Sequence, residues 1–223
     1  EGRLGPINKD QREFIESAEE SCAEMVEMIN SLLDIHKFDA GRMVMKFSQE
    51  NLKPLLEKML AQFSTAAEKG EIKLSFEISP DLPECRLDRT TFTRMMANLF
   101  SNALKFTREK GEIAISADIV DDILKISADI PGGLYPSAFT RQSGSYLRIT
   151  VKDSGVGIPK EALVVIFDRF IQAQNRREGK SRGTGLGLAF CRKVMDAHKG
   201  LIWAESEEGK GSVFTALFPL SAD

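Results

Sequence analysis

The feature that most constrains the fold is an apolar stripe near the start of the chain, where such a side chain recurs every three or four residues. Its members are Phe14, Ala18, Cys22, Met25, Ile29 and Leu32, and the spacing continues to His36. This period is close to that of a coiled-coil seam, and acidic residues fill the other faces. It predicts one coiled-coil-type helix over residues 8–44, about 55 Å long at ~1.5 Å per residue, which weakens near Gly41.

A single helix with one apolar stripe has to bury that stripe against a partner. No second long amphipathic pattern follows it, so we expect the partner to be an upstream segment, a second copy of the chain, or both. Because the chain begins at Glu1 and its first methionine is Met25, we expect it to be a fragment. Residues 1–45 are therefore predicted to be a dimerising helical arm, and a membrane anchor could lie upstream.

Composition narrows the class of protein further. The chain is 42% hydrophobic and 28% charged, as expected for a soluble globular protein. Its three cysteines, Cys22, Cys85 and Cys191, are too far apart for a disulfide framework or a zinc site, which favours a reducing, cytoplasmic compartment. No apolar run approaches the ~20 residues needed to span a bilayer. We expect no membrane contact by this segment and no nucleic-acid partner.

The formal charge of −3 hides an uneven distribution. Residues 1–45 hold ten acidic and five basic residues, whereas residues 168–182 hold five basic and two acidic ones. A basic stretch of this kind suits an anion such as phosphate, although in isolation a solvated basic loop is the better explanation.

Short strands and helices alternate beyond residue 44, without strict β-α-β order. Strands are predicted over residues 44–48, 73–78, 112–119, 123–128, 146–152, 201–205 and 212–219. Helices are predicted over residues 51–69, 88–106, 160–167 and 184–198. Several of the strands look antiparallel. The pattern predicts an α/β fold over residues 46–223, a two-layer α/β sandwich whose mixed sheet is covered on one face by helices.

Two glycine-containing segments follow this pattern at points where a ligand could approach the backbone. Asp153, Gly155 and Gly157 lie between a strand and a helix, where sites on open sheets form, but a structural turn is an equally good interpretation. Gly183, Gly185 and Gly187 lead into a helix, although glycine costs up to ~1 kcal/mol in a helix interior. Bare N–H groups at a helix start bind phosphate; the alternative is a flexible connector.

A third segment places polar side chains on one face of the helix predicted over residues 88–106. Asn98, Asn102 and Lys105 have the i, i+4, i+7 spacing. Amide oxygens can ligate a Mg²⁺ ion that also holds phosphates, and a lysine can neutralise a phosphate. A merely solvated polar face is the competing interpretation.

The order and spacing of these segments resemble a known family. The motifs are N-L-x-x-N-A-x-K-F-T from Asn98, D-S-G-V-G-I-P from Asp153, F-D-R-F from Phe167, G-T-G-L-G-L-A from Gly183, and G-K-G-S-V-F from Gly209. Together they resemble the N, G1, F, G2 and closing boxes of the sensor histidine kinase ATP-binding domain. Residues 32–41 also resemble the end of the second helix of that family's dimerisation and phosphotransfer hairpin.

The resemblance implies a Bergerat-type (GHKL) ATP-binding fold over about residues 48–220, with ATP and Mg²⁺ as ligands. Asp153 would receive the adenine amino group, Asn102 would ligate Mg²⁺ with Asn98 assisting, and Lys105 would contact phosphate. Residues 168–185 would form the ATP lid, and Gly183, Gly185 and Gly187 would donate N–H groups to the phosphates. The full implied ATP-binding set is Asn98, Asn102, Lys105, Asp153, Gly155, Gly157, Ile158, Phe170, Gly183, Thr184, Gly185, Leu186, Gly187, Leu188 and Ser212.

Two departures from the family pattern concern the phosphoacceptor and an insertion. The expected motif, a histidine followed by an acid and then a proline, is absent, and His36 and His198 stand at the wrong places for it. We expect both to be structural or solvent-facing and the nucleophile to lie upstream. Residues 120–146 replace a short hairpin, and we expect a neutral insertion, with a partner-docking surface as the alternative.

The resemblance implies the catalytic core of a two-component sensor histidine kinase. It would pass the γ-phosphoryl group of ATP to a histidine outside this fragment, for relay to an aspartate on a response-regulator receiver domain. A nucleotide-binding scaffold that regulates another kinase through its helical arm is the alternative function. A serine kinase or motor ATPase of the same superfold is a third option, which the signature in residues 29–41 disfavours.

Overall fold

The computed structural model describes residue 5 and residues 7–121, 144–171 and 183–220. The chain divides into two compact units, residues 1–43 and residues 44–223. Each unit is described by itself below.

The first unit is helix α1 (Lys9–Asp39), which begins with a capping box. The Asn8 side chain accepts from the Gln11 N–H at 2.8 Å, and the Gln11 side chain accepts from the Asn8 N–H at 3.0 Å. The helix ends five residues before the predicted end at residue 44, because Gly41 takes a left-handed φ of 64° that a helix cannot contain. Much of the apolar stripe is exposed, with Phe14 at 77% and Met25 at 62%.

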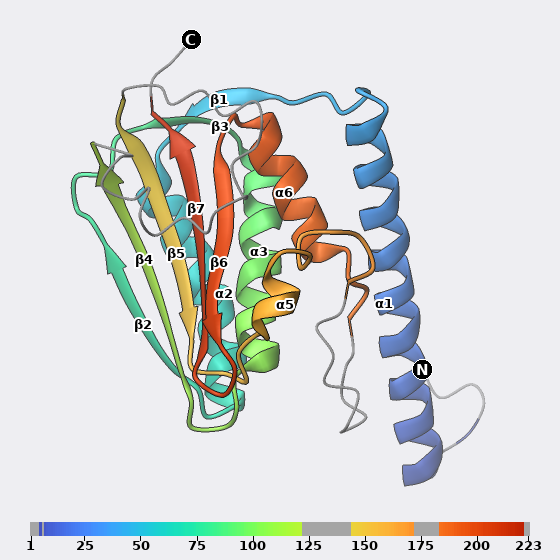
Figure 1. The fold of residues 1–223 in the computed structure, drawn as a ribbon. Helices are drawn as coiled ribbons and strands as arrows, with labels where there is room; N and C mark the ends of the chain where they lie inside the picture. The colour runs from blue at the N-terminus through green and yellow to red at the C-terminus, as the bar shows by residue number, and fades with distance from the viewer. Residues whose placement is uncertain (1–4, 6, 122–143, 172–182, 221–223) are drawn as a thin grey trace. The chain divides into compact units, whose positions relative to one another are not determined.

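The second unit is built on a five-stranded mixed sheet with the order β2-β4-β5-β7-β6 (Figure 1). The strands are β2 (Lys73–Ile78), β4 (Glu112–Val120), β5 (Tyr146–Asp153), β6 (Leu201–Glu207) and β7 (Gly211–Pro219). Strand β2 pairs in parallel with β4, and every other neighbouring pair is antiparallel. The predicted mixed sheet is confirmed.

Three helices form a layer on one face of this sheet, as Figure 1 shows. They are α2 (Leu52–Lys69), α3 (Arg89–Phe106) and α6 (Gly187–Ala197). Helix α2 packs beside β2, α3 against β5, and α6 against both α3 and β6. Phe92 of α3 meets Phe218 of β7 edge to face, with ring centroids 5.5 Å apart. The predicted two-layer α/β sandwich is therefore also confirmed.

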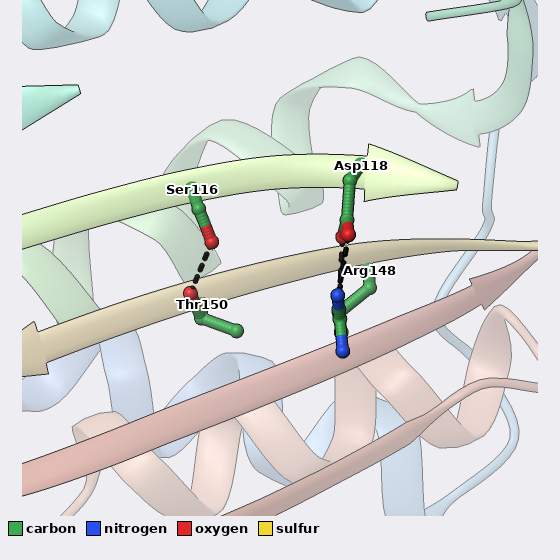
Figure 2. A network of polar contacts seen from close by, with 4 residues as sticks. All are labelled: Ser116, Asp118, Arg148 and Thr150. Carbon is green, nitrogen blue, oxygen red and sulfur yellow. Dashed lines mark hydrogen bonds and ion pairs between the residues drawn. The ribbon is translucent and has the colours of Figure 1, made fainter. Parts of the chain in front are cut away.

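The central strands alternate between this core and the other face of the sheet. Ile113, Ile115 and Ala117 of β4 are buried against the helices, whereas the residues between them are partly exposed. On the far face, Ser116 hydrogen-bonds its register partner Thr150, and Asp118 pairs with Arg148 (Figure 2). These cross-strand pairs fix the register of β4 against β5.

A separate two-stranded sheet pairs β1 (Phe47–Glu50) with β3 (Cys85–Asp88). The strand predicted over residues 44–48 is shifted toward the C-terminus, and β3 was not predicted because its four residues are too few for their alternation to stand out. His198 holds this sheet to the end of α6. Its Nε2 accepts from the Asp88 N–H at 3.0 Å, and its Nδ1 lies 2.7 Å from the Val194 carbonyl oxygen.

Two predicted helices of the second unit are shorter than expected. Helix α5 covers only Lys160–Leu163, and residues 164–167 form turns instead of completing the predicted helix. Helix α6 begins at Gly187 and not at residue 184, because Gly185 has a φ of 67°. The strand predicted over residues 123–128 and most of the predicted lid lie outside the described residues.

Candidate nucleotide-binding site

Asp153 ends the central strand β5 and is only 4% exposed. Its carboxylate accepts from the Gly155 N–H at 2.8 Å and from the Ser212 backbone N–H. Burial raises the pKa of Asp153 above its ordinary value, and these two N–H groups only partly oppose that effect. The site therefore holds a desolvated carboxylate, which would be stabilised by a further hydrogen-bond donor.

The turn after Asp153 packs too closely against other backbone for any residue but glycine. A Cβ on Gly155 would lie 2.3 Å from the carbonyl oxygen of Phe106, at the C-terminus of α3. Gly157 has a φ of 70°, and its Cβ would lie 2.2 Å from the Glu207 carbonyl oxygen. The two glycines therefore fix the turn between the end of α3 and the end of β6.

Ser206 joins this turn to the strand beside it, a role that the sequence motifs did not reveal. Its hydroxyl accepts from the Ile158 N–H at 2.8 Å and donates to the Gly211 carbonyl at 2.7 Å. It also lies 3.1 Å from the hydroxyl of Ser212, the register partner of Asp153. Asp153, Gly155, Gly157, Ile158 and Ser212 thus form one connected group.

The polar face of α3 meets the glycine segment that leads into α6. The Asn98 side chain donates to the Gly187 carbonyl at 3.3 Å. Two turns further on, the Lys105 ammonium lies so close to Gly183 that a Cβ there would be 2.6 Å from Nζ. Asn102 lies between them on the same face, is partly buried, and makes no side-chain hydrogen bond within the described part of the chain.

Two hydrogen bonds hold the glycine segment that precedes α6. The Phe170 N–H donates to the Gly185 carbonyl at 2.9 Å, and the Thr184 hydroxyl accepts from the Leu186 N–H at 3.2 Å. Leu186 is buried, and as the N-cap of α6 it supplies no side-chain cap. Leu188 is partly buried in the first turn. Within the described part of the chain, no side chain caps the first N–H groups of α6, and such groups can bind an anion.

The C-terminal half of α3 connects the two groups. Lys105 contacts the glycine segment, and the next residue, Phe106, accepts from the Val156 N–H at 3.3 Å. The buried carboxylate and the start of α6 therefore both lie beside the C-terminal half of α3. Phe170, 55% exposed, stands at the edge of the described part of the predicted lid.

The donor chemistry fits a magnesium ion that arrives with phosphates. No cluster of three or more His, Cys, Asp or Glu side chains that could hold a metal occurs in the described residues. The candidate ligands are the amide oxygens of Asn102 and Asn98. Mg²⁺ is commonly held by one or two protein oxygens together with substrate phosphates and waters.

The comparisons with known proteins agree with this geometry. Residues 87–222, more than half of the chain, match the family described as histidine kinase-, DNA gyrase B- and HSP90-like ATPases. The sensor histidine kinase WalK of Bacillus subtilis (strain 168) is 30% identical over 217 residues, which are 95% of this chain and 31% of WalK. The chain thus spans about a third of that relative's length.

Two solved structures share the fold over nearly the whole chain. Full-length ShkA in complex with AMPPNP has a TM-score of 0.72 at 22% identity, covering 100% of this chain and 42% of that one. Histidine kinase ThkA in complex with the response regulator protein TrrA has a TM-score of 0.69 at 23% identity, covering 98% and 54%.

The chain belongs to the histidine kinase-, DNA gyrase B- and HSP90-like ATPase family, as its motifs predicted. Within that family it carries the catalytic ATP-binding domain of a sensor histidine kinase, the domain type of two-component signal transduction. No helix among the described residues is long and apolar enough to cross a membrane.

Proposed function

We propose that the chain binds ATP with Mg²⁺ and transfers the γ-phosphoryl group to a histidine outside the chain, for relay to an aspartate of a response-regulator receiver domain. The observation that carries the proposal is that the C-terminal half of α3 contacts two segments: the turn after Asp153 and the glycine segment before α6. Phe106 contacts the turn that follows the buried Asp153, and Lys105 contacts the glycine segment before α6. An adenine and a chain of phosphates need this combination of an acceptor and a positive, N–H-rich surface.

The proposed adenine contacts lie around Asp153. Its carboxylate would accept from the adenine amino group, with Ser212 beside it and the turn at Gly155, Gly157 and Ile158 supplying close backbone approach. The burial that raises the Asp153 pKa supports this role, because a donor from the ligand replaces lost hydration.

The proposed phosphate contacts lie along the glycine segment and α3. Lys105 would neutralise phosphate charge, and the N–H groups of residues 183–188 would donate to phosphate oxygens. The Asn102 side chain makes no hydrogen bond among the described residues, and its amide oxygen would hold Mg²⁺. When bound, that ion would neutralise the charge that develops on the phosphates. Asn98 would assist chiefly by fixing the start of α6 through Gly187.

Phosphoryl transfer needs little covalent catalysis by the protein, so positioning of the reactants and neutralisation of phosphate charge would suffice. The attacking group would be the imidazole of a histidine in a segment outside this chain. His198 is unsuited, because both of its ring nitrogens are engaged and it is 6% exposed.

The exposed stripe of α1 supports a dimeric arm, in which a second copy of the chain buries Phe14, Met25 and Ile29. The likeness to ThkA, whose structure contains a response regulator, supports a receiver domain as partner. Free thiols at all three cysteines agree with a cytoplasmic setting.

The adenine assignment is tested by Asp153→Asn, with binding of a fluorescent ATP analogue as the readout. A hydrogen bond to a charged group is worth ~1.5–3 kcal/mol, so affinity should fall at least about tenfold. The variant should stay folded, because an amide at this buried position needs less hydration than a carboxylate. Asp118→Asn is the matched control, since Asp118 pairs with Arg148 on the far face of the sheet. Unchanged affinity in Asp153→Asn would refute the assignment.

A further inference from the structure

Four paired residues form a row across the sheet at the candidate nucleotide-binding site. Ile113 of β4 pairs with Asp153 of β5. Asp153 pairs with Ser212 of β7, which pairs with Ser206 of β6; Figure 1 shows these three strands side by side. Directly paired residues of antiparallel strands point to the same face of the sheet. Because Ile113 is buried against the helices, the three polar side chains point to the helical layer as well.

The direction of the Ser206 hydroxyl hydrogen is fixed by its neighbours. A hydroxyl carries one hydrogen and two lone pairs. Ser206 Oγ lies 2.7 Å from the Gly211 carbonyl oxygen, which can only accept, so the hydrogen points to that carbonyl. With the hydrogen elsewhere, two acceptor oxygens would face each other at this distance. One lone pair of Ser206 accepts from the Ile158 N–H at 2.8 Å, and the second is left for another donor.

The Ser212 hydroxyl is that donor. Its Oγ lies 3.1 Å from Ser206 Oγ. Because Ser206 donates its hydrogen to Gly211, the hydrogen between the two serine oxygens belongs to Ser212. Within the described part of the chain, the Ser212 hydroxyl makes no other hydrogen bond. Ser212 therefore has lone pairs, and no hydrogen, to offer a ligand beside Asp153.

We infer that Ser206 is a positioning residue that sets the base preference of the site, a role that rests on the proposed binding of ATP. It holds the Ser212 hydroxyl as an acceptor, so Asp153 and Ser212 form a pair of neighbouring acceptors. The 6-amino group of adenine has two hydrogens to donate to such a pair. A 6-oxo group has none, and its lone pairs would face those of the protein. The pair therefore favours adenine over hypoxanthine, because a site built to accept hydrogen bonds rejects a base that cannot donate them.

Competition between a fluorescent ATP analogue and unlabelled ATP or ITP, with Mg²⁺ present, measures this preference. ITP is the probe because its base carries oxo in place of the 6-amino group, and the intact chain should bind ATP more tightly. In Ser206→Ala, the Ser212 hydroxyl loses its acceptor and is free to rotate and donate to the oxo group. The ratio of ATP affinity to ITP affinity should therefore fall about three- to tenfold, the effect of one neutral hydrogen bond.

Two control variants separate this role from a purely structural one. Ser206→Thr keeps the hydroxyl on a residue type that suits a strand, so it should keep the affinity ratio. Ser116→Ala removes a hydroxyl that pairs with Thr150 on the far face of the sheet, and it should keep the ratio too (Figure 2). Circular dichroism and thermal unfolding report on the folding of each variant. A loss of stability alone would weaken the binding of both nucleotides and leave their ratio unchanged.

Ser212→Ala covers the case in which Ser206→Ala fails to fold. Removing an acceptor should lower the ratio of ATP affinity to ITP affinity, whereas removing a donor should raise it. The inference is overturned by equal affinities in the intact chain, by an unchanged ratio in folded Ser206→Ala, or by an unchanged or raised ratio in Ser212→Ala. Each of these results leaves the proposed binding of ATP standing. Failure of the intact chain to bind ATP would overturn the proposed function and the inference together.

Discussion

At the residue scale, burial sets the behaviour of the ionisable groups around the site. Asp153 is desolvated at the end of β5, and two backbone N–H groups of the described residues compensate its charge in part. Its pKa is raised, so part of its population is neutral at pH values where an exposed aspartate is fully ionised. A ligand that donates to this carboxylate binds its ionised form better.

This argument predicts the pH dependence of nucleotide binding. Affinity for an ATP analogue should fall in acid, and the fall should begin at a higher pH than the ordinary aspartate pKa of 3.8 would give. Titrations between neutral pH and pH 4, with folding followed by circular dichroism, would measure it. A flat profile down to pH 4 would argue against Asp153 as an acceptor for the ligand.

Burial also makes the three cysteines differ in the reactivity of their thiols. It raises the pKa of Cys85 to about 11 and that of Cys191 to about 12, whereas Cys22 on α1 is exposed. In the folded chain a thiol reagent should therefore modify one cysteine, Cys22, and in denaturant all three. Mass spectrometry of the labelled peptides measures this; rapid native labelling of Cys85 or Cys191 would contradict the burial of those thiols.

At the element scale, one imidazole ties the small β1–β3 sheet to α6. Truncating His198 to alanine leaves the Asp88 N–H without its acceptor, at a cost of ~1–3 kcal/mol, and adds a cavity. We expect His198→Ala to lower the free energy of unfolding by about 2–4 kcal/mol in urea denaturation. His36→Ala, at an exposed position on α1, is the control and should change it little.

The same histidine should make stability sensitive to acid. Burial lowers the His198 pKa below 6.5, although its bond to Val194 and the charge of Asp88 oppose the shift. The unfolded chain therefore binds the proton more readily, so this stability is present above pH 6.5 and is lost as the pH falls through the folded-state pKa. The loss should be smaller in His198→Ala; an identical acid dependence would contradict it.

Elements with a strong period could be predicted from the sequence, and those set by single glycines or tertiary contacts could not. The alternation in β4 and β5 and the apolar face of α3 predicted the bounds of those elements to within about one residue. The C-terminal end of α1 and the start of α6 were misplaced, because left-handed φ values at Gly41 and Gly185 decide them. Strand β3 depends on pairing with β1, and its four residues are too few for an alternation to identify a strand.

At the scale of the whole molecule, the motifs predicted the family, but the contacts among them come from the fold. Asn98 and Gly187 are 89 positions apart, and no spacing rule indicates their hydrogen bond. Ser206 was missed for the same reason, since a lone serine in a strand carries no signal until Ile158, Gly211 and Ser212 surround it.

The central claim is that this chain uses ATP to phosphorylate a histidine that it does not itself contain. The most direct measurement supplies the purified chain with Mg²⁺, γ-labelled ATP and a separate domain that carries the proposed phosphoacceptor histidine. We predict an acid-labile label on a histidine of that domain, lost in Asp153→Asn and retained in Asp118→Asn. Tight ATP binding with no labelled histidine would contradict the claim and favour a nucleotide-binding scaffold.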